Sequence, residues 1–590
     1  MLLSLCMIVR DEEENLERCL KSVQGLADET ILVDTGSKDG TVRIASAFGA
    51  DVHRFAWNGS FAEARNRSLE LARGDWILLM DADDELEPGG REKILRLLRN
   101  AGDEELFCCK TLCYLGERPD EKNFFINRNL RLIRNGRGYR FSGRIHEQIV
   151  SGDGRLPRVR TAEIRFYHYG YLNGQIERKE KRKRNIRLIR MELDENPGNA
   201  YMLFCMGNEF LAAAQAAEAL AFYRRSLLLT DRDAGYRPAL LVRMILCCSR
   251  LGLERDRDFL IREGMRSCPD QADFPFLKAC ALQRGKRPES AVRLYRKCLR
   301  MAPGSSRASG ISALCVQYAL GGAYAQLGES GKALRAFAAA VRSSPRFRES
   351  WEKMVGLLLA EGRSSASVRR RMTRLAGSDF EACRTLSAVF YHRRMYRESL
   401  AFCRRARRLR PGENPALEYA EGICEFYLNQ YGGAARHLAK AESGPFAADA
   451  AWYRLLSILF RTGRIPPYAK WEGKVGLPYY ETARECLRCI LGEAGAPFTD
   501  EAQKYREPVY RLLEILLAAG KAEAFRSSLA LLGRVRDGSE HLRLGKLYFR
   551  YGYGESAYGE LIRSIRTNGP MDAEGLAILQ DTFPDGDPAG

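Results

Sequence analysis

Four acidic residues follow an apolar run in the stretch Asp75-Trp76-Ile77-Leu78-Leu79-Met80-Asp81-Ala82-Asp83-Asp84-Glu85. The run is too short for a stable helix and comes after Gly74, so it is predicted to form a buried strand. Clustered carboxylates at the end of such a strand repel one another and resist the loss of water. A divalent cation removes that conflict, because Mg²⁺ and Mn²⁺ bind carboxylate oxygens and leave positions open for phosphate. The Asp-x-Asp spacing therefore predicts a site for a metal and a diphosphate.

The segments that must position these carboxylates alternate between strand-like and helix-like patterns over residues 1–115. The pattern predicts strands at 4–9, 30–34, 51–55 and 76–80, and helices at 12–23, 40–48 and 61–72. Such alternation is typical of a mostly parallel sheet with helices on both faces, in which ligands bind at the carboxyl ends of the strands. We expect the charged turns that follow the strands to meet at that edge, namely those at 10–12, 34–40 and 81–83.

Composition narrows the class of protein. The chain has 590 residues, of which 45% are hydrophobic, and is long enough for several domains. No run approaches the ~18 apolar residues of a membrane helix. The apolar start meets the charged residues 10–14 at once, which predicts a strand and not a signal peptide. Among the 17 cysteines, residues such as Cys205, Cys315 and Cys424 occur singly within apolar helical patterns, which favours reduced core thiols and a cytoplasmic location.

The formal net charge of +19 is the one global anomaly. Lysine and arginine are spread along the whole chain, so no specific nucleic-acid partner is expected. The basic run at 178–184 is predicted to be a solvated helical face. An excess of positive charge attracts anionic nucleotide donors, acidic polymers or a membrane surface without a dedicated motif.

From about residue 180 the pattern is helical throughout, with a period near 34 residues that resembles the tetratricopeptide repeat. Two copies contain Met206-Gly207 with Tyr223, and Leu544-Gly545 with Leu561, and weaker copies run through 272–303, 380–411 and 415–442. The clearest copy contains Leu320-Gly321, Tyr324, Gly328, Ala333, Phe337, Ala340 and Pro345. Small residues at these offsets let two antiparallel helices approach. Such an array binds a peptide or protein on its concave face, or braces the neighbouring domain.

Four motifs in the first 170 residues resemble family 2 glycosyltransferases in type and order. They are Ser4-Leu5-Cys6-Met7-Ile8-Val9-Arg10-Asp11-Glu12, Val33-Asp34-Thr35-Gly36-Ser37-Lys38-Asp39-Gly40-Thr41, Ala64-Arg65-Asn66-Arg67 and Asp81-Ala82-Asp83-Asp84. The resemblance implies an α/β GT-A fold, Rossmann-like and with a mostly parallel sheet, over residues 1–175. An all-α solenoid of tetratricopeptide type is expected over 176–570, and a disordered tail over 571–590.

For the donor, the resemblance implies contacts from Val9, Asp11, Asp34, Lys38, Arg65 and Asp81. Asp34 can accept hydrogen bonds from a base or ribose, and the glycine-containing turn after it allows close approach of the backbone. The alternative is an ordinary turn between a strand and a helix, with Asp39 as a local cap. Arg65 can neutralise a diphosphate or can lie at the surface with Asn66.

For the metal, taken as Mn²⁺ or Mg²⁺, Asp83 is the expected chief ligand, and Asp81 assists through the ribose or a metal-bound water. His168 completes the shell or belongs to an aromatic packing corner. His146 contacts substrate or binds the metal.

Transfer of a sugar also needs a base to deprotonate the acceptor. His146-Glu147 resembles a His-Glu pair in this part of related enzymes, so Glu147 is the expected base. The alternative is a glutamate fixed by ion pairs to Arg131 or Arg144. The Glu-Asp pair that this family normally carries at the base position is missing.

These observations predict an inverting transferase that moves a sugar from a nucleotide diphosphate sugar, of the uridine type, to a peptide or protein presented by the repeats. The alternatives are an enzyme acting on a cell-surface polysaccharide or lipid-linked saccharide, and a non-catalytic interaction scaffold. The acidic pair Asp81 and Asp83 argues against the scaffold, since an inactive domain has no need of crowded carboxylates.

Overall fold

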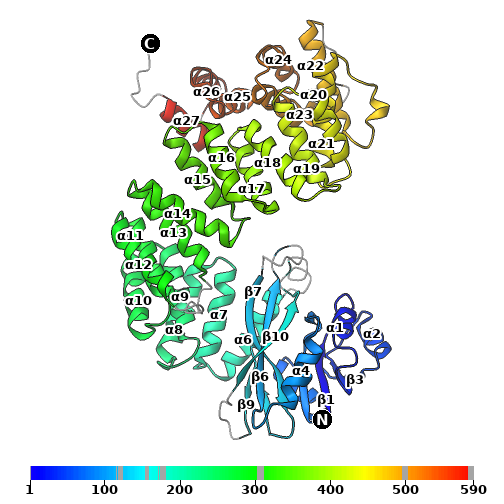
Figure 1. Ribbon diagram of the computed structural model, residues 1–590, viewed down its shortest axis with the longest axis vertical. Helices are drawn as coiled ribbons and strands as arrows, with labels where there is room; N and C mark the ends of the chain where they lie inside the picture. The colour runs from blue at the N-terminus through cyan, green and yellow to red at the C-terminus, as the bar shows by residue number, and fades with distance from the viewer. Residues whose placement is uncertain are drawn as a thin grey trace. The chain divides into compact units, whose positions relative to one another are not determined.

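A computed structural model describes residues 2–582, except for 115, 117–123, 153–158, 171, 173–180, 302–310, 494–497, 499–501 and 570. The chain divides into two compact units, Met1–Ser312 (unit 1) and Ala313–Gly590 (unit 2). Unit 1 contains the sheet and the first part of the helical region, as Figure 1 shows in blue to green. The domain boundary near residue 175 remains a prediction from the change of sequence pattern.

The described part of unit 1 holds an eight-stranded sheet in the order β3-β2-β1-β4-β7-β6-β10-β5. Its strands are β1 (Leu3–Val9), β2 (Glu29–Asp34), β3 (Asp51–Arg54), β4 (Trp76–Leu79), β5 (Asp84–Leu86), β6 (Leu106–Tyr114), β7 (Phe124–Arg134) and β10 (Arg160–His168). A separate hairpin pairs β8 (Arg140–Ser142) with β9 (Gln148–Val150).

Strands β1 to β4 form the parallel half of the sheet, as the sequence predicted. Val9 pairs with Asp34, and Cys6 pairs with Leu79, so the chain leaves β1, β2 and β4 at the same edge. The core strands are apolar because both faces are covered, and every residue of β4 is buried. The three charged turns expected at one edge therefore do meet there.

The other half of the sheet mixes directions. β7 runs antiparallel to both β4 and β6, and β10 runs parallel to β6. The short strand β5 pairs antiparallel with β10, in a register that sets His168 opposite Asp84. This pairing brings the end of β10 to the acidic stretch that follows β4.

Helices cover the sheet and continue beyond it (Figure 1). Those within the sheet region are α1 (Leu16–Ser22), α2 (Thr41–Ala47), α3 (Phe61–Leu71) and α4 (Gly90–Arg99). The rest of unit 1 contains α6 (Lys181–Glu195), α7 (Ala200–Ala212), α8 (Ala216–Leu229), α9 (Arg237–Arg250), α10 (Glu254–Ser267), α11 (Asp273–Arg284) and α12 (Pro288–Arg300).

Unit 2 is helical in its described residues. It contains α13 (Ala313–Gln326), α14 (Ser330–Ser343), α15 (Arg348–Ala360), α16 (Ser365–Ala376), α17 (Phe380–His392), α18 (Tyr396–Leu409), α19 (Pro415–Tyr427), α20 (Tyr431–Ala441), α21 (Ala447–Thr462), η1 (Tyr468–Lys470), α22 (Leu477–Leu491), α23 (Ala502–Ala518), α24 (Ala522–Ser528), η2 (Leu529–Arg534), α25 (Glu540–Arg550), α26 (Gly554–Asn568) and α27 (Ala573–Thr582).

The glycines of the repeat pattern mark close contacts between paired helices. A Cβ on Gly321 of α13 would stand 2.6 Å from the ring of Phe337 on α14. The same relation recurs between Gly207 and Tyr223, and between Gly545 and Leu561, each pair sixteen residues apart. A side chain at the glycine would push the two helices apart. The recurrence confirms helix pairs of tetratricopeptide type in both units.

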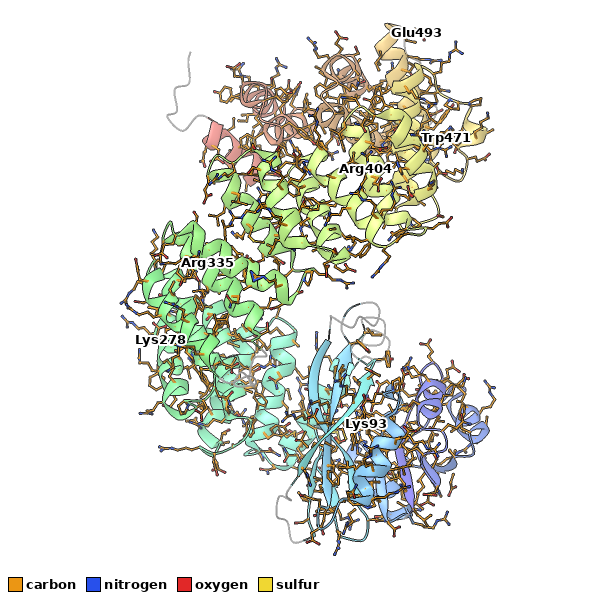
Figure 2. All side chains as sticks on the ribbon, in the orientation of Figure 1. Lys93, Lys278, Arg335, Arg404, Trp471 and Glu493 are labelled. Carbon is orange, nitrogen blue, oxygen red and sulfur yellow. The ribbon has the colours of Figure 1, made fainter. Side chains whose placement is uncertain are left out.

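Buried carboxylates lie inside unit 2. Glu418, Glu421 and Glu425 share one face of α19 and are buried. Arg404 of α18, labelled in Figure 2, pairs with Glu425 at 2.8 Å, and Arg407 pairs with Glu421 at 3.1 Å. Pairing with arginine offsets only part of the cost of taking these charges out of water, and burial still raises the pKa of Glu421.

The segment expected to be a disordered tail is in part helical. α27 covers Ala573–Thr582, and Ile578 is buried, so the end of the array gains a packed helix. Residues 583–590 lie outside the described residues. All 17 cysteines are free, in agreement with reduced thiols. In the described part of the chain, none of the helices combines the length and apolar character needed to cross a membrane.

Candidate active site

A cleft of about 1340 Å³ opens at the carboxyl edge of the sheet. Of the residues predicted to bind donor or metal, or to act as the base, eight line it and two do not. Those in the cleft are Val9, Asp11, Arg65, Asp81, Asp83, His146, Glu147 and His168. Asp34 and Lys38 are outside the lining.

Asp34 and Asp11 instead hold two loops in shape. Asp34 is buried, and its Oδ1 accepts a hydrogen bond from the Ser37 amide at 3.0 Å. Asp11 has a left-handed φ of 53° and accepts from the Lys38 amide at 2.7 Å. Asp39 accepts from the Thr41 amide at 3.0 Å, as expected of a local cap. The bond between Asp11 and Lys38 joins the loop after β1 to the loop after β2, and the other two bonds shape the second loop.

The acidic stretch after β4 is largely neutralised by arginines from other elements. Asp84 is fully buried and pairs with Arg131 of β7 at 2.6 Å. Asp81 pairs with Arg65 of α3 at 2.9 Å. Burial opposes the charge of Asp81, but Arg65 and Arg131 outweigh it and lower its pKa below the ordinary value. The crowding of carboxylates alone therefore does not require a metal.

Asp83 differs from its neighbours. Its side chain is 10% exposed, and its carboxylate accepts no hydrogen bond from a described residue. The nearest partner is His168 Nδ1 at 3.4 Å. Asp83, Asp84 and His168 form the one group of possible metal-ligating side chains found in the described residues, with ligand atoms within 4.8 Å of one another.

His168 is oriented by Asp84. Its Nδ1 lies 3.0 Å from Asp84 Oδ1, and this contact fixes the orientation of the ring. Burial opposes the protonated ring, but the hydrogen bond to Asp84 and the charge of Asp83 outweigh it and raise the pKa of His168. Gly170 completes this corner: a Cβ there would stand 2.4 Å from Asp83 Oδ2 and 2.7 Å from His168 Nε2. The carboxylate and the imidazole thus converge on a space that only a glycine leaves open.

Glu147 faces the acidic stretch through Arg65. Arg65 Nε donates to Glu147 Oε1 at 2.6 Å, and its Nη2 donates to Asp81 Oδ1. Neither arginine proposed as a structural partner of Glu147 fulfils that role, because Arg131 binds Asp84 and Arg144 pairs with Glu195.

The loop that carries Glu147 is held by several backbone contacts. The Asn66 side chain donates to the Phe141 carbonyl at 2.9 Å and accepts from the Phe141 amide at 2.7 Å. His146 adopts a left-handed φ of 52° directly after the buried Ile145. Burial lowers the pKa of His146, against the opposing charge of Glu147. His146 lines the cleft but does not belong to the group formed by Asp83, Asp84 and His168.

The sequence analysis missed three features of this site. Asp84 belongs to the group of possible ligands but was not expected there. Asn66 was given no role beyond the surface. Lys183 and Arg184 are exposed, as expected of a solvated face, but it was not foreseen that they and Arg187 of α6 line the cleft. Residues 178–180 of that run lie outside the described residues. Charge at residues 183–187 was the only available signal, and it did not show which way the helix faces.

Known proteins resemble the chain in the same region. The model of glycosyl transferase family 2 matches residues 4–161. A TPR repeat-containing protein of Synechococcus elongatus is 32% identical over 261 residues, which are 42% of this chain and 62% of that protein. The SPbeta prophage-derived glycosyltransferase SunS of Bacillus subtilis is 30% identical over 225 residues, or 38% of this chain and 52% of SunS. The chain thus covers less than two thirds of either relative.

A solved structure aligns over a shorter segment. Glucosyl-3-phosphoglycerate synthase from Mycobacterium tuberculosis, in complex with Mn²⁺, uridine diphosphate and glucosyl-3-phosphoglycerate, is 27% identical. The alignment covers 19% of this chain and 44% of that one, with a TM-score of 0.17. No property of this chain follows from so partial an overlap.

Proposed function

Because residues 4–161 carry a family 2 glycosyltransferase domain, we propose that the chain transfers a sugar from a nucleotide diphosphate sugar, of the uridine type, to an acceptor nucleophile. The observation that carries the proposal is the corner formed by Asp83 and His168, which line the cleft, and by Gly170 beside them. A buried carboxylate that accepts no hydrogen bond from a described residue and an imidazole nitrogen meet there, in a corner that a Cβ on Gly170 would fill.

This corner fits a divalent cation. Asp83 and His168 offer an oxygen and a nitrogen ligand, and Asp84 fixes the histidine ring through Nδ1. Asp84 itself is neutralised by Arg131, so it acts as a positioning residue. When bound, Mn²⁺ or Mg²⁺ would stabilise the negative charge of the leaving diphosphate.

The remaining donor contacts come from the same edge of the sheet. Val9 and Asp11 line the cleft at the end of β1, and Asp81 lines it at the end of β4. Asp34 and Lys38 act on the donor only through the loop that they shape. Arg65 binds Glu147 through Nε and Asp81 through Nη2, so one guanidinium holds both carboxylates.

Glu147 is the proposed base. The acceptor nucleophile forms a bond to the anomeric carbon while the bond from that carbon to the diphosphate oxygen breaks. The proton of the acceptor passes to a Glu147 carboxylate oxygen, and the bonding electrons leave with the diphosphate. Attack from the side opposite the leaving group inverts the anomeric centre. His146 lies beside Glu147 as a neighbour of the acceptor.

The acceptor is proposed to be a peptide or protein bound by the repeats. The helix pairs marked by Gly207 and Gly321 support this, since arrays of this type present a continuous surface to a partner. An acceptor on a polysaccharide or lipid-linked saccharide is the alternative outcome when peptides fail as substrates.

The donor site is tested with the full chain and an uridine diphosphate sugar. We expect binding and slow hydrolysis of the donor that require Mn²⁺ or Mg²⁺, and loss of both in Asp83→Asn. Asp103→Asn makes the same change at an exposed aspartate and is the matched control. A parent protein that binds no nucleotide in the presence of metal would refute the enzyme and leave the interaction scaffold.

The base is tested separately. Glu147→Gln keeps a hydrogen-bond acceptor for Arg65 but removes the carboxylate, so transfer should be lost while donor binding persists. Loss of donor binding as well would assign Glu147 a purely structural part.

A further inference from the structure

The first described helix after the sheet presents cations to the cleft. Lys183, Arg184 and Arg187 of α6 line the same cleft as Asp83 and Glu147. We call these three side chains the α6 wall. All three are exposed, so a ligand in the cleft can reach them.

The opposite face of α6 fixes the wall in place. Leu188 and Ile189 are fully buried, in a core that also contains Ile145. Arg144 pairs with Glu195 near the end of the helix. Because these contacts reach the loop that precedes Glu147, the wall is anchored to the same loop as the proposed base. A ligand meets it without a large rearrangement of the helix.

Arg184 and Arg187 of the wall form no ion pair with a carboxylate of a described residue. Arg187 makes no hydrogen bond or ion pair with a described residue. Arg184 lies over the ring of Phe61, 5.1 Å from its centroid. Burial and the nearby positive charge of Arg10 lower the pKa of Arg184. The positive charges of Arg10 and Arg184 repel each other, and an anion bound between them lowers the electrostatic energy.

The balance of charges in the cleft also favours contact between the ligand and further cations. Arg65 is already paired with Asp81 and Glu147. A divalent ion held by Asp83 keeps one net positive charge, whereas the diphosphate of a nucleotide sugar carries two negative charges. Further cations balance that charge, and Arg184 and Arg187 line the cleft without an ion pair to a described carboxylate.

We propose that the α6 wall binds the phosphate oxygens of the ligand that enters this cleft. The inference rests on the proposed function in taking that ligand to be a nucleotide diphosphate sugar. The same chemistry is offered by a phosphate group on the acceptor, and the two sources are separated by experiment. In either case a helix outside the sheet contributes to substrate binding.

The test compares Arg187→Ala with Arg190→Ala in the full chain. Arg190 is an exposed arginine on the same helix and does not line the cleft, so it controls for the loss of charge. Calorimetric titration with uridine diphosphate and Mg²⁺ should show affinity reduced about tenfold by Arg187→Ala, the usual effect of one charge-assisted hydrogen bond. Uridine, which has no phosphate, should bind all three proteins equally. Arg187→Lys should restore most of the affinity.

A second arm identifies the source of the phosphate. If uridine diphosphate binds Arg187→Ala normally, pyrophosphate is titrated into protein saturated with uridine diphosphate. Loss of that second binding event in Arg187→Ala assigns the wall to an anionic acceptor. Equal behaviour of Arg187→Ala and Arg190→Ala in both arms overturns the proposal.

The test of the α6 wall gives a result even if the proposed glycosyltransferase function fails. If the parent protein binds no uridine diphosphate, pyrophosphate is titrated alone. Binding that Arg187→Ala loses and Arg190→Ala keeps would retain the anion site while the nucleotide-sugar function is abandoned. Equal binding to both variants, or no binding to the parent, refutes the wall as a phosphate site. Unchanged thermal unfolding of Arg187→Ala shows that the fold is intact.

Discussion

Replacing Gly170 by alanine tests the proposed metal site by adding one methyl group without changing any charge. The added Cβ would stand 2.4 Å from Asp83 Oδ2 and 2.7 Å from His168 Nε2, whereas ordinary contact begins at 3.4 Å. Gly170 does not have a left-handed φ, so an alanine is compatible with its backbone. The methyl group therefore occupies the space on which the two side chains converge and perturbs little else.

The expected effect is larger on metal binding than on stability. Overpacking costs about 1–3 kcal/mol, and Asp83 can relieve part of it by turning toward the open cleft. That turn separates the carboxylate from His168 Nε2. Disturbing the surroundings of metal ligands typically lowers affinity about 10–100-fold, and we expect a loss of that size.

The measurement is Mn²⁺ binding to the full chain, followed by the electron paramagnetic resonance signal of the free ion. Gly235→Ala is the matched control, because Gly235 has no atom within 4 Å of its Cβ position and no left-handed φ. Thermal unfolding of both variants separates a local effect from a loss of fold. If Gly170→Ala binds Mn²⁺ as tightly as the parent and unfolds at the same temperature, the assignment of this corner as a metal site is refuted.

Further predictions concern the support of the site and the repeats. Asn66→Ala removes two hydrogen bonds to the backbone before β9 and should lower the free energy of unfolding by about 1–3 kcal/mol, measured by urea titration. Gly321→Ala should destabilise by about 1–3 kcal/mol, because its Cβ meets the ring of Phe337 at 2.6 Å. Gly331→Ala, with open space around its Cβ, should be neutral or stabilising, and equal effects of the two changes would contradict the proposed packing. Burial raises the pKa of Glu421 in the folded protein. The protonated carboxyl therefore contributes fully to the free energy of unfolding below the pKa of Glu421 in the unfolded chain, and this contribution is lost as pH rises through its pKa in the folded protein. Glu421→Gln should therefore raise the unfolding temperature at neutral pH and leave it unchanged near pH 4; the same shift at both pH values would contradict this.

The fold was predictable to a large extent because its signals are local. The parallel half of the sheet follows from apolar runs of strand length that alternate with amphipathic segments, and β1, β2 and β4 appear within a residue or two of the predicted positions. The repeats were found because close helix packing demands a small residue at a constant offset from a large one, as at Gly321 and Phe337. The helix at 573–582 was missed, because its amphipathic pattern is short and its contacts come from the rest of the array.

The site was predictable only where a pattern in the chain reflects its chemistry. Asp81 and Asp83 were found from two carboxylates at a strand end, and Glu147 from resemblance. Nothing in the sequence separated Asp83 from Asp84, since both follow the same strand. The structure separates them: Arg131 reaches Asp84 from a strand almost fifty residues later, whereas none of the described arginines pairs with Asp83.

The sequence by itself determined the elements of this protein, the edge at which its polar turns meet, and the residue types available for a metal and a base. These depend on periodicity and on neighbours along the chain. Only the tertiary structure decided which carboxylates are neutralised, that Gly170 leaves room between Asp83 and His168, and that α6 turns its cations toward the cleft. The reason is physical: the charge state and free space of a side chain depend on groups brought near it by folding, and those groups lie tens of residues away in the chain.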